Sequence, residues 1–94
     1  MVYAPAVTWT VYLTRKAHKK LAKLPRSVQD LADLAVVDLE EQGIKPQGWN
    51  TLKTGDEEYR LRLNYRYRMR YCVTDKKTLE IEVFYVGHRR EAYR

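Results

Sequence analysis

Arginines alternate with apolar residues along the stretch YRLRLNYRYRMRYCV, which begins at Tyr59 and ends at Val73. Side chains on a β-strand point alternately to its two faces, so this period of two predicts strands rather than a helix. Asn64–Tyr65 marks a tight connection, and we therefore expect neighbouring strands at 57–63 and 65–74. The expected apolar face carries Tyr59, Leu61, Leu63, Tyr67, Met69, Tyr71 and Val73. The opposite face carries Arg60, Arg62, Arg66, Arg68, Arg70 and Cys72.

Two helices are predicted before these strands. Thr14 suits a helix N-cap, and the first helix should end at Pro25, because proline disfavours helical geometry in the residue before it. A second helix is expected at 26–42, with Gly43 at its C-terminal cap. The apolar stripe of that second helix consists of Val28, Leu31, Ala35 and Leu39.

Two further strands complete the predicted sheet, one at 7–13 and one at 79–86. Residues 43–53, rich in glycine and proline, are expected to form a loop. On the last strand the side chains expected to face the helices are Leu79, Ile81, Val83 and Tyr85, with Glu80, Glu82 and Phe84 on the other face. The order β-α-α-β-β-β predicts an α+β fold, with a helical hairpin packed on one face of a small, mainly antiparallel sheet.

The length and charge of the chain narrow the classes of function. A chain of 94 residues is expected to form one domain, residues 1–94. A single cysteine, Cys72, and no recognisable signal peptide or membrane span predict a soluble, cytoplasmic protein. The net charge is +6, and residues 59–94 hold ten Lys/Arg against four Asp/Glu. Such a concentrated basic surplus indicates an anionic partner, with nucleic acid as the first candidate.

Two interpretations of the arginine face are open. Glu80 and Glu82 could neutralise some arginines through cross-strand ion pairs. Two glutamates cannot balance five arginines, however, and guanidinium groups match phosphate with paired hydrogen bonds. Interleaved tyrosines add surfaces on which unpaired bases can stack. The residues predicted to bind RNA are Arg60, Arg62, Arg66, Arg70 and Arg90.

The segments YRLRL, YRMRYCV and the terminal VGHRREAYR resemble the RelE/ParE superfamily of toxins from bacterial toxin–antitoxin pairs, and its RelE-like, RNA-cleaving branch in particular. The resemblance implies the RelE-like microbial RNase fold. It also implies a type II toxin that cleaves messenger RNA in the ribosomal A site without a metal. The implied phosphate-binding residues are Arg68 and Arg89, and the terminal Tyr93 would orient the nucleotide. Arg60 and Arg62 stand where several members carry basic residues, often lysine.

The proton acceptor of such a reaction is not evident from the sequence. Lysine can accept a proton when its pKa is lowered, whereas arginine stays charged. His88 is therefore a catalytic candidate, since histidine titrates near neutrality and neighbouring positive charge favours its neutral form. Glu57, Glu58 and Glu82 are competing candidates. Neither a metal-ligand set nor a phosphate-binding glycine loop is readable, so no metal or cofactor is predicted.

Other functions remain possible on the same residues. A ParE-like inhibitor of DNA gyrase would share the fold without cleaving RNA, although Tyr93 argues against it. A non-enzymatic RNA-binding module is the simplest alternative. The resemblance further implies a cognate antitoxin, a small protein with a DNA-binding N-terminus and an acidic C-terminal segment. Messenger RNA and the ribosome are the other expected partners.

Overall fold

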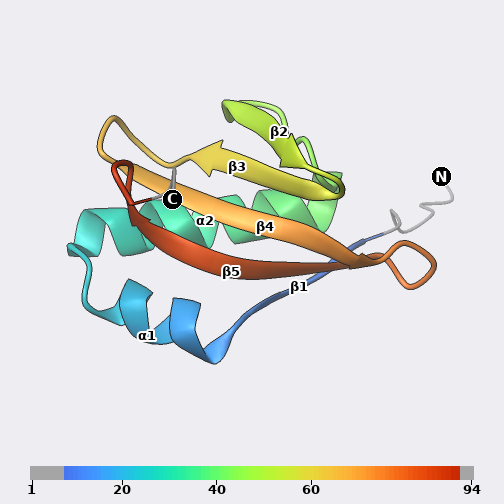
Figure 1. Ribbon diagram of the computed structural model, residues 1–94, viewed down its shortest axis with the longest axis horizontal. Coiled ribbons are helices and arrows are strands. Elements are labelled where there is room, and N and C mark those ends of the chain that lie inside the picture. Colours follow the sequence, from blue (N-terminus) through green and yellow to red (C-terminus); the bar gives the residue numbers. More distant parts are fainter. Residues whose placement is uncertain (1–7, 92–94) are drawn as a thin grey trace, which may run out of the picture.

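The computed structural model describes residues 8–91 and shows two helices packed on a five-stranded sheet (Figure 1). The helices are α1 (Arg15–Ala22) and α2 (Arg26–Gln42). The strands are β1 (Thr10–Leu13), β2 (Thr51–Gly55), β3 (Glu58–Arg62), β4 (Tyr67–Asp75) and β5 (Glu80–His88). The predicted α+β fold is confirmed. Within residues 8–91 no helix is long and apolar enough to cross a membrane.

Both helices begin where the sequence predicts, and α2 also ends there, whereas α1 ends at Ala22, before Pro25. The hydroxyl oxygen of Thr14 accepts a hydrogen bond from the backbone N–H of Ala17 (3.1 Å), which satisfies one donor of the first turn of α1. Pro25 precedes α2 with φ −55°, a value its ring imposes. Gly43 ends α2 with φ +87°, and its N–H donates to the carbonyl oxygen of Leu39 (2.9 Å). Glycine is required here because a positive φ is costly for other residues.

The strand order is β1-β5-β4-β3-β2, with β1 parallel to β5 and the other neighbours antiparallel. The mainly antiparallel sheet is thus confirmed, but the loop predicted at 43–53 is partly wrong. Its last residues form part of β2, which pairs with β3 through Thr51 opposite Leu61 and Leu52 opposite Arg60. This edge strand has three consecutive exposed residues, so no alternation signals it in the sequence.

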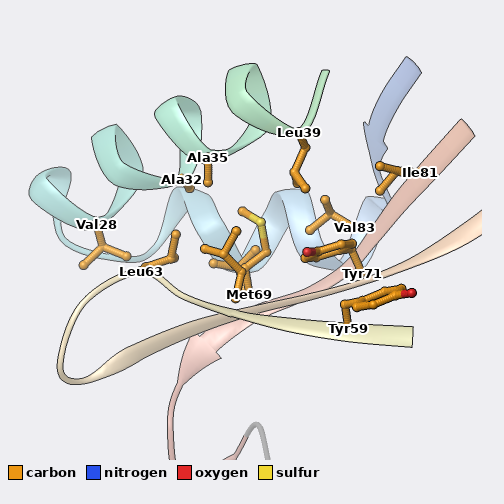
Figure 2. Close-up of a cluster of buried hydrophobic side chains, with 12 residues drawn as sticks. Val28, Ala32, Ala35, Leu39, Tyr59, Leu63, Met69, Tyr71, Ile81 and Val83 are labelled. Atoms are coloured by element: carbon orange, nitrogen blue, oxygen red, sulfur yellow. The ribbon is translucent and has the colours of Figure 1, made fainter. Parts of the chain in front are cut away.

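The core lies between α2 and the apolar face of the sheet (Figure 2). Figure 2 shows side chains of α2 pointing toward β3, β4 and β5, with the rings of Tyr59 and Tyr71 stacked at 5.7 Å between centroids. Residues that belong to this buried cluster are Val28, Ala32, Ala35, Leu39, Tyr59, Leu61, Leu63, Met69, Tyr71, Ile81, Val83 and Val86. The predicted apolar faces of 57–63 and 65–74 are confirmed.

A bulge in β5 overturns part of the predicted alternation. Tyr71 lies opposite Val83, but Arg70 lies opposite Tyr85, so β5 has an extra residue at this point. Beyond the bulge every side chain changes face. Val86 therefore enters the core, and the prediction that Tyr85 faces the helices is wrong. Tyr85 lies on the arginine face instead.

Helix α1 packs mainly against β5. Strand β1 pairs with β5 only as far as Val83, and past that point α1 lies alongside β5 (Figure 1). Ala17 is the buried residue of α1, and the lysines of the helix are at least partly exposed to solvent. Basic side chains of α1 are consequently placed beside the arginine face.

Candidate nucleic-acid interface

The strand register arranges the arginine face in rows of directly opposed residues. Arg60 lies opposite Arg70, and Arg62 lies opposite Arg68. Like charges in such positions repel one another, so these two rows concentrate positive charge at a cost to the folded chain. The structure thus brings together four of the arginines that the sequence analysis assigned to RNA.

The strand register does not place Glu80 or Glu82 directly opposite an arginine, as the alternative with cross-strand ion pairs would require. Glu82 lies opposite Cys72 and Glu80 lies opposite Asp75, so neither glutamate is the direct partner of an arginine across the sheet. The carboxylates and the guanidinium groups therefore occupy different stretches of the same face.

A row of Glu58, Cys72 and Glu82 lies next to the arginine rows, toward the other end of the strands. Burial, and then the charges of Glu82 and Glu58, raise the pKa of the Cys72 thiol. A thiol with a raised pKa is a poor nucleophile, which agrees with the absence of a nucleophile motif around Cys72. Glu57 contacts the Nζ of Lys76 at 2.7 Å. The three glutamates considered as proton acceptors thus lie away from the row of Arg62.

At the opposite end of the face the connection between β3 and β4 meets the end of β5 (Figure 1). The backbone N–H of Arg89 donates to the carbonyl oxygen of Arg66 (2.7 Å). The guanidinium carbon of Arg89 lies 4.4 Å from the ring centroid of Tyr65, and that of Arg62 lies 5.9 Å from it. We call Arg62, Tyr65 and Arg89 the Tyr65 cluster. It joins residues that are far apart in the sequence.

Tyr65 was not predicted as a site residue. Its side chain is 62% exposed, the largest value among the exposed large hydrophobic residues. The sequence analysis placed Tyr65 in the tight connection between two predicted strands and gave it no binding role. The available signal was its chemistry, since an aromatic ring in a turn between arginine-bearing strands is a stacking surface next to phosphate ligands.

Arg68, the implied phosphate ligand on β4, is 7% exposed. Its Nη1 donates hydrogen bonds to the carbonyl oxygens of Asn64 (2.7 Å), Tyr67 (3.1 Å) and Tyr65 (3.3 Å). The Nη1 group of Arg68 therefore stabilises the connection between β3 and β4. Its charge still lies beside Arg62, where it adds to the positive potential of the face.

His88 lies opposite Tyr67 in the register, and the two rings meet edge to face at 5.8 Å between centroids. By alternation from Val86 this is the core side of the sheet rather than the arginine face. The bulge in β5 causes this placement. The Nδ1 of His88 accepts a hydrogen bond from the N–H of Arg90 (3.2 Å), which leaves the proton of the neutral ring on Nε2.

The remaining predicted residues have varied positions. The side chains of Arg66 and Arg90 are exposed at the ends of β4 and β5. The guanidinium carbon of Arg70 lies 5.1 Å from the ring centroid of Phe84. Tyr93 lies outside the described residues, so its role stays a prediction. No cluster of three or more His, Cys, Asp or Glu side chains that could hold a metal ion occurs in residues 8–91.

Beside the arginine rows a cleft of about 340 Å³ opens between α1 and β5. The residues that line it include the basic Lys16, Lys20 and Arg70 and the apolar Ala17, Phe84 and Val86. The carboxylate of Glu91 enters this cleft, 2.8 Å from the Nζ of Lys20 and 3.2 Å from the hydroxyl of Tyr85. Burial and the neighbouring Glu91 carboxylate raise the pKa of Tyr85 to about 12. The cleft therefore already accepts one carboxylate from the chain itself.

Solved structures of RelE toxins share the fold of this chain. The archaeal RelE–RelB complex from Pyrococcus horikoshii matches with a TM-score of 0.73 and 23% identity, over 87% of this chain and 96% of that one. The RelBE2 toxin–antitoxin complex from Mycobacterium tuberculosis matches with a TM-score of 0.66 and 25% identity, over 88% and 100%. The isolated RelE toxin of E. coli matches with a TM-score of 0.68 and 23% identity, over 90% of each chain.

These matches cover nearly the whole of the chain, and they identify its fold as that of the RelE-like toxins. No family model and no curated protein sequence matches the chain. The RelE-like fold that the sequence motifs indicated is therefore confirmed by these structural matches.

Proposed function

We propose that this chain is the toxin of a type II toxin–antitoxin pair and a metal-independent endoribonuclease that cleaves messenger RNA in the ribosomal A site. The observation that carries the proposal is the convergence of Arg62 and Arg89 on the exposed ring of Tyr65, beside the row of Arg68. A surface of this kind combines phosphate ligands with a stacking surface for bases, which is what single-stranded RNA requires.

Cleavage would proceed by attack of the ribose 2′-oxygen on the adjacent phosphorus, with rupture of the bond between phosphorus and the 5′-oxygen. One proton leaves the 2′-hydroxyl and one is delivered to the departing 5′-oxygen. The products are a 2′,3′-cyclic phosphate and a 5′-hydroxyl end. Negative charge grows on the phosphorane oxygens during attack, and fixed guanidinium groups stabilise that charge more than they stabilise the substrate.

In this proposal Arg89 and Arg62 contact the scissile phosphate or its neighbour. The RNA on either side of that phosphate is bound by four further arginines, Arg60, Arg66, Arg70 and Arg90. Arg68 acts through its charge and through the connection that its Nη1 supports. Tyr93 orients the nucleotide, as the resemblance implies.

His88 remains the proposed proton carrier of the reaction. The hydrogen bond that its Nδ1 accepts leaves Nε2 as the proton-bearing nitrogen of the neutral ring. Delivery of a proton to the departing 5′-oxygen requires the doubly protonated ring, which becomes neutral imidazole on transfer. While it is charged, the ring would have to give up the hydrogen bond from Arg90. Its place on the side of Tyr67 means that RNA would have to pass around the end of β5 to reach it. A glutamate acceptor would instead have to come from the row of Glu58 and Glu82.

The test is cleavage of a defined messenger RNA on programmed ribosomes, with Arg89→Ala and the charge-matched control Arg26→Ala. Arg26 is exposed at the start of α2 and pairs with Asp30, away from the arginine face. Loss of one transition-state charge donor lowers the rate by about 100-fold or more. We expect this loss for Arg89→Ala and unchanged cleavage for Arg26→Ala, with ribosomes still bound by both variants.

Two results would contradict the proposal. Wild-type protein that binds programmed ribosomes and leaves the message intact is not a nuclease. Inhibition of gyrase supercoiling without RNA cleavage would establish the ParE-like alternative instead. Mapping of transcript 5′ ends after brief induction of wild type and Arg89→Ala extends the same comparison to the cell.

We also propose a cognate antitoxin with a DNA-binding N-terminus and an acidic C-terminal segment. The cleft between α1 and β5 supports this choice of partner, because lysines, an arginine and apolar side chains line it and a carboxylate already enters it. A small neighbouring gene that encodes such a protein is expected, and the two products should purify together. Purification of the chain from its native source without such a partner would contradict this part of the proposal.

A further inference from the structure

Tyr65 is held in a defined position although most of its side chain is exposed. The Oδ1 of Asn64 accepts hydrogen bonds from the N–H groups of Arg66 (2.8 Å) and Tyr67 (2.9 Å), which forms a tight turn around Tyr65. The N–H of Leu63 donates to the carbonyl oxygen of Tyr67 (3.0 Å) and closes the turn at its base. The backbone that carries the exposed ring is therefore ordered by its own hydrogen bonds.

The same turn is supported from beneath by a nearly buried charge. Arg68 is 7% exposed, and its Nη1 donates to three carbonyl oxygens of the turn and its flank, which belong to Asn64, Tyr65 and Tyr67. Burial of a guanidinium group is costly unless such dipoles surround it. The arrangement orders the backbone that carries the ring before any ligand arrives, which lowers the entropy lost on binding.

Two guanidinium groups lie close to the ring. Arg89 contacts it at 4.4 Å and Arg62 lies at 5.9 Å, and the backbone of Arg89 is tied to the turn through the carbonyl oxygen of Arg66. Both arginines come from elements outside the turn, so the cluster forms only in the folded chain. An exposed aromatic ring beside cationic groups matches an unpaired nucleotide, whose base can stack while its phosphates contact the arginines.

We propose that the Tyr65 cluster binds one unpaired nucleotide of single-stranded RNA, with its base stacked on Tyr65 and its flanking phosphates at Arg62 and Arg89. This deepens the proposed nuclease function and rests on it for the identity of the strand. Stacking on a tyrosine uses the flat face that every base has, so the site accepts all four bases with little preference. Tyr65 is thus a substrate-positioning residue.

The test uses a short single-stranded RNA with a 2′-O-methyl backbone, which cannot be cleaved by 2′-oxygen attack, and a 2-aminopurine at successive positions. Binding is followed by fluorescence anisotropy, and stacking by quenching of the 2-aminopurine. Removal of one stacking residue weakens single-strand binding by about five- to 100-fold. We expect that loss for Tyr65→Ala, together with loss of quenching at one position. Tyr65→Phe keeps the ring and should keep both signals.

Tyr12→Ala is the matched control, because Tyr12 is also an exposed tyrosine (38%) but lies on β1 at the other edge of the sheet. It should bind RNA as wild type does. An RNA with an abasic nucleotide at the quenched position should bind wild type and Tyr65→Ala equally well. Urea midpoints of both alanine variants, measured alongside, should stay close to wild type, because neither ring belongs to the buried core.

Equal affinity and equal quenching of wild type and Tyr65→Ala would overturn the inference. A loss confined to binding of the antitoxin, with RNA binding unchanged, would overturn it too and assign Tyr65 to a protein contact. A different result would contradict the proposed nuclease function and leave the stacking site intact: RNA bound through Tyr65 but not cleaved in its unmodified form. Normal cleavage and normal RNA binding by Tyr65→Ala contradict the stacking site alone.

Discussion

Arg68 illustrates at the residue scale how one side chain can serve both structure and charge. The resemblance assigns it to phosphate, and the structure shows its Nη1 bound to three carbonyl oxygens of the connection between β3 and β4. A buried acceptor that loses its donor costs about 1–3 kcal/mol. We therefore expect Arg68→Ala to lower the free energy of unfolding by about that amount, as measured by urea denaturation.

Arg66→Ala provides the comparison for that measurement. Arg66 is a neighbouring arginine with an exposed side chain, and it contacts Arg89 through its backbone carbonyl, which the substitution retains. Exposed substitutions of this kind change stability by less than about 0.5 kcal/mol. Equal losses for the two variants would contradict a stabilising role for the hydrogen bonds that Arg68 makes to the turn.

Among the strands and helices, the bulge in β5 has the largest effect on the site, because it determines which side chains of β5 lie on the arginine face. It turns Tyr85 to the arginine face, where the phenol lies over Gly87: a Cβ at residue 87 would be 2.5 Å from the Oη and 2.8 Å from the Cζ of Tyr85. The hydroxyl of Tyr85 also contacts the carbonyl oxygen of His88 (3.2 Å) and Glu91. Glycine at 87 is therefore favoured by the close approach of the Tyr85 ring rather than by backbone geometry.

Gly87→Ala should displace the Tyr85 ring and lower the free energy of unfolding by about 1–3 kcal/mol, the usual effect of overpacking. In a Tyr85→Ala background the same glycine substitution should be close to neutral, since the obstructing ring is gone. A double-mutant cycle measured by urea denaturation reports this difference as a coupling energy. Additive effects would mean that the glycine matters for some reason other than Tyr85.

For the molecule as a whole, two tyrosines link folding to alkaline pH. Burial raises the pKa of Tyr71, whose hydroxyl donates to the carbonyl oxygen of Ile44, and burial together with Glu91 raises the pKa of Tyr85 to about 12. In the unfolded chain both phenols ionise near their ordinary pKa of about 10. Unfolding therefore releases protons above that pH, so the folded chain has its full stability below about pH 10 and loses it as the pH rises through about 12.

The measurement is the free energy of unfolding in urea from about pH 8 to about pH 11, for wild type and Tyr85→Phe. Wild type should lose stability more steeply above about pH 10, because Tyr85→Phe has one fewer phenol to ionise. Lysines also titrate in this range, but their contribution is common to both proteins and cancels in the comparison. Parallel curves would show that Tyr85 ionises alike in the folded and the unfolded chain.

The amino-acid sequence by itself determined the elements and most of their faces. Pro25 and Gly43 bound α2 because one restricts the backbone before it and the other permits a positive φ. The alternation around Leu61 and Met69 distinguished the side chains of the core from those of the arginine face. It could do so because side-chain direction along a strand is a local property of the backbone. The segments YRLRL, YRMRYCV and VGHRREAYR also sufficed to indicate the RelE-like fold.

Only the tertiary structure decided how those faces meet. Because of one extra residue in β5, Val86 lies in the core where the alternation predicted Tyr85. For the same reason His88 lies on the same face as Tyr67. The same structure placed Arg89 on Tyr65, beside a turn that Arg68 supports from within. Register, bulges and contacts across the chain depend on partners distant in sequence, and no local pattern of residues encodes them.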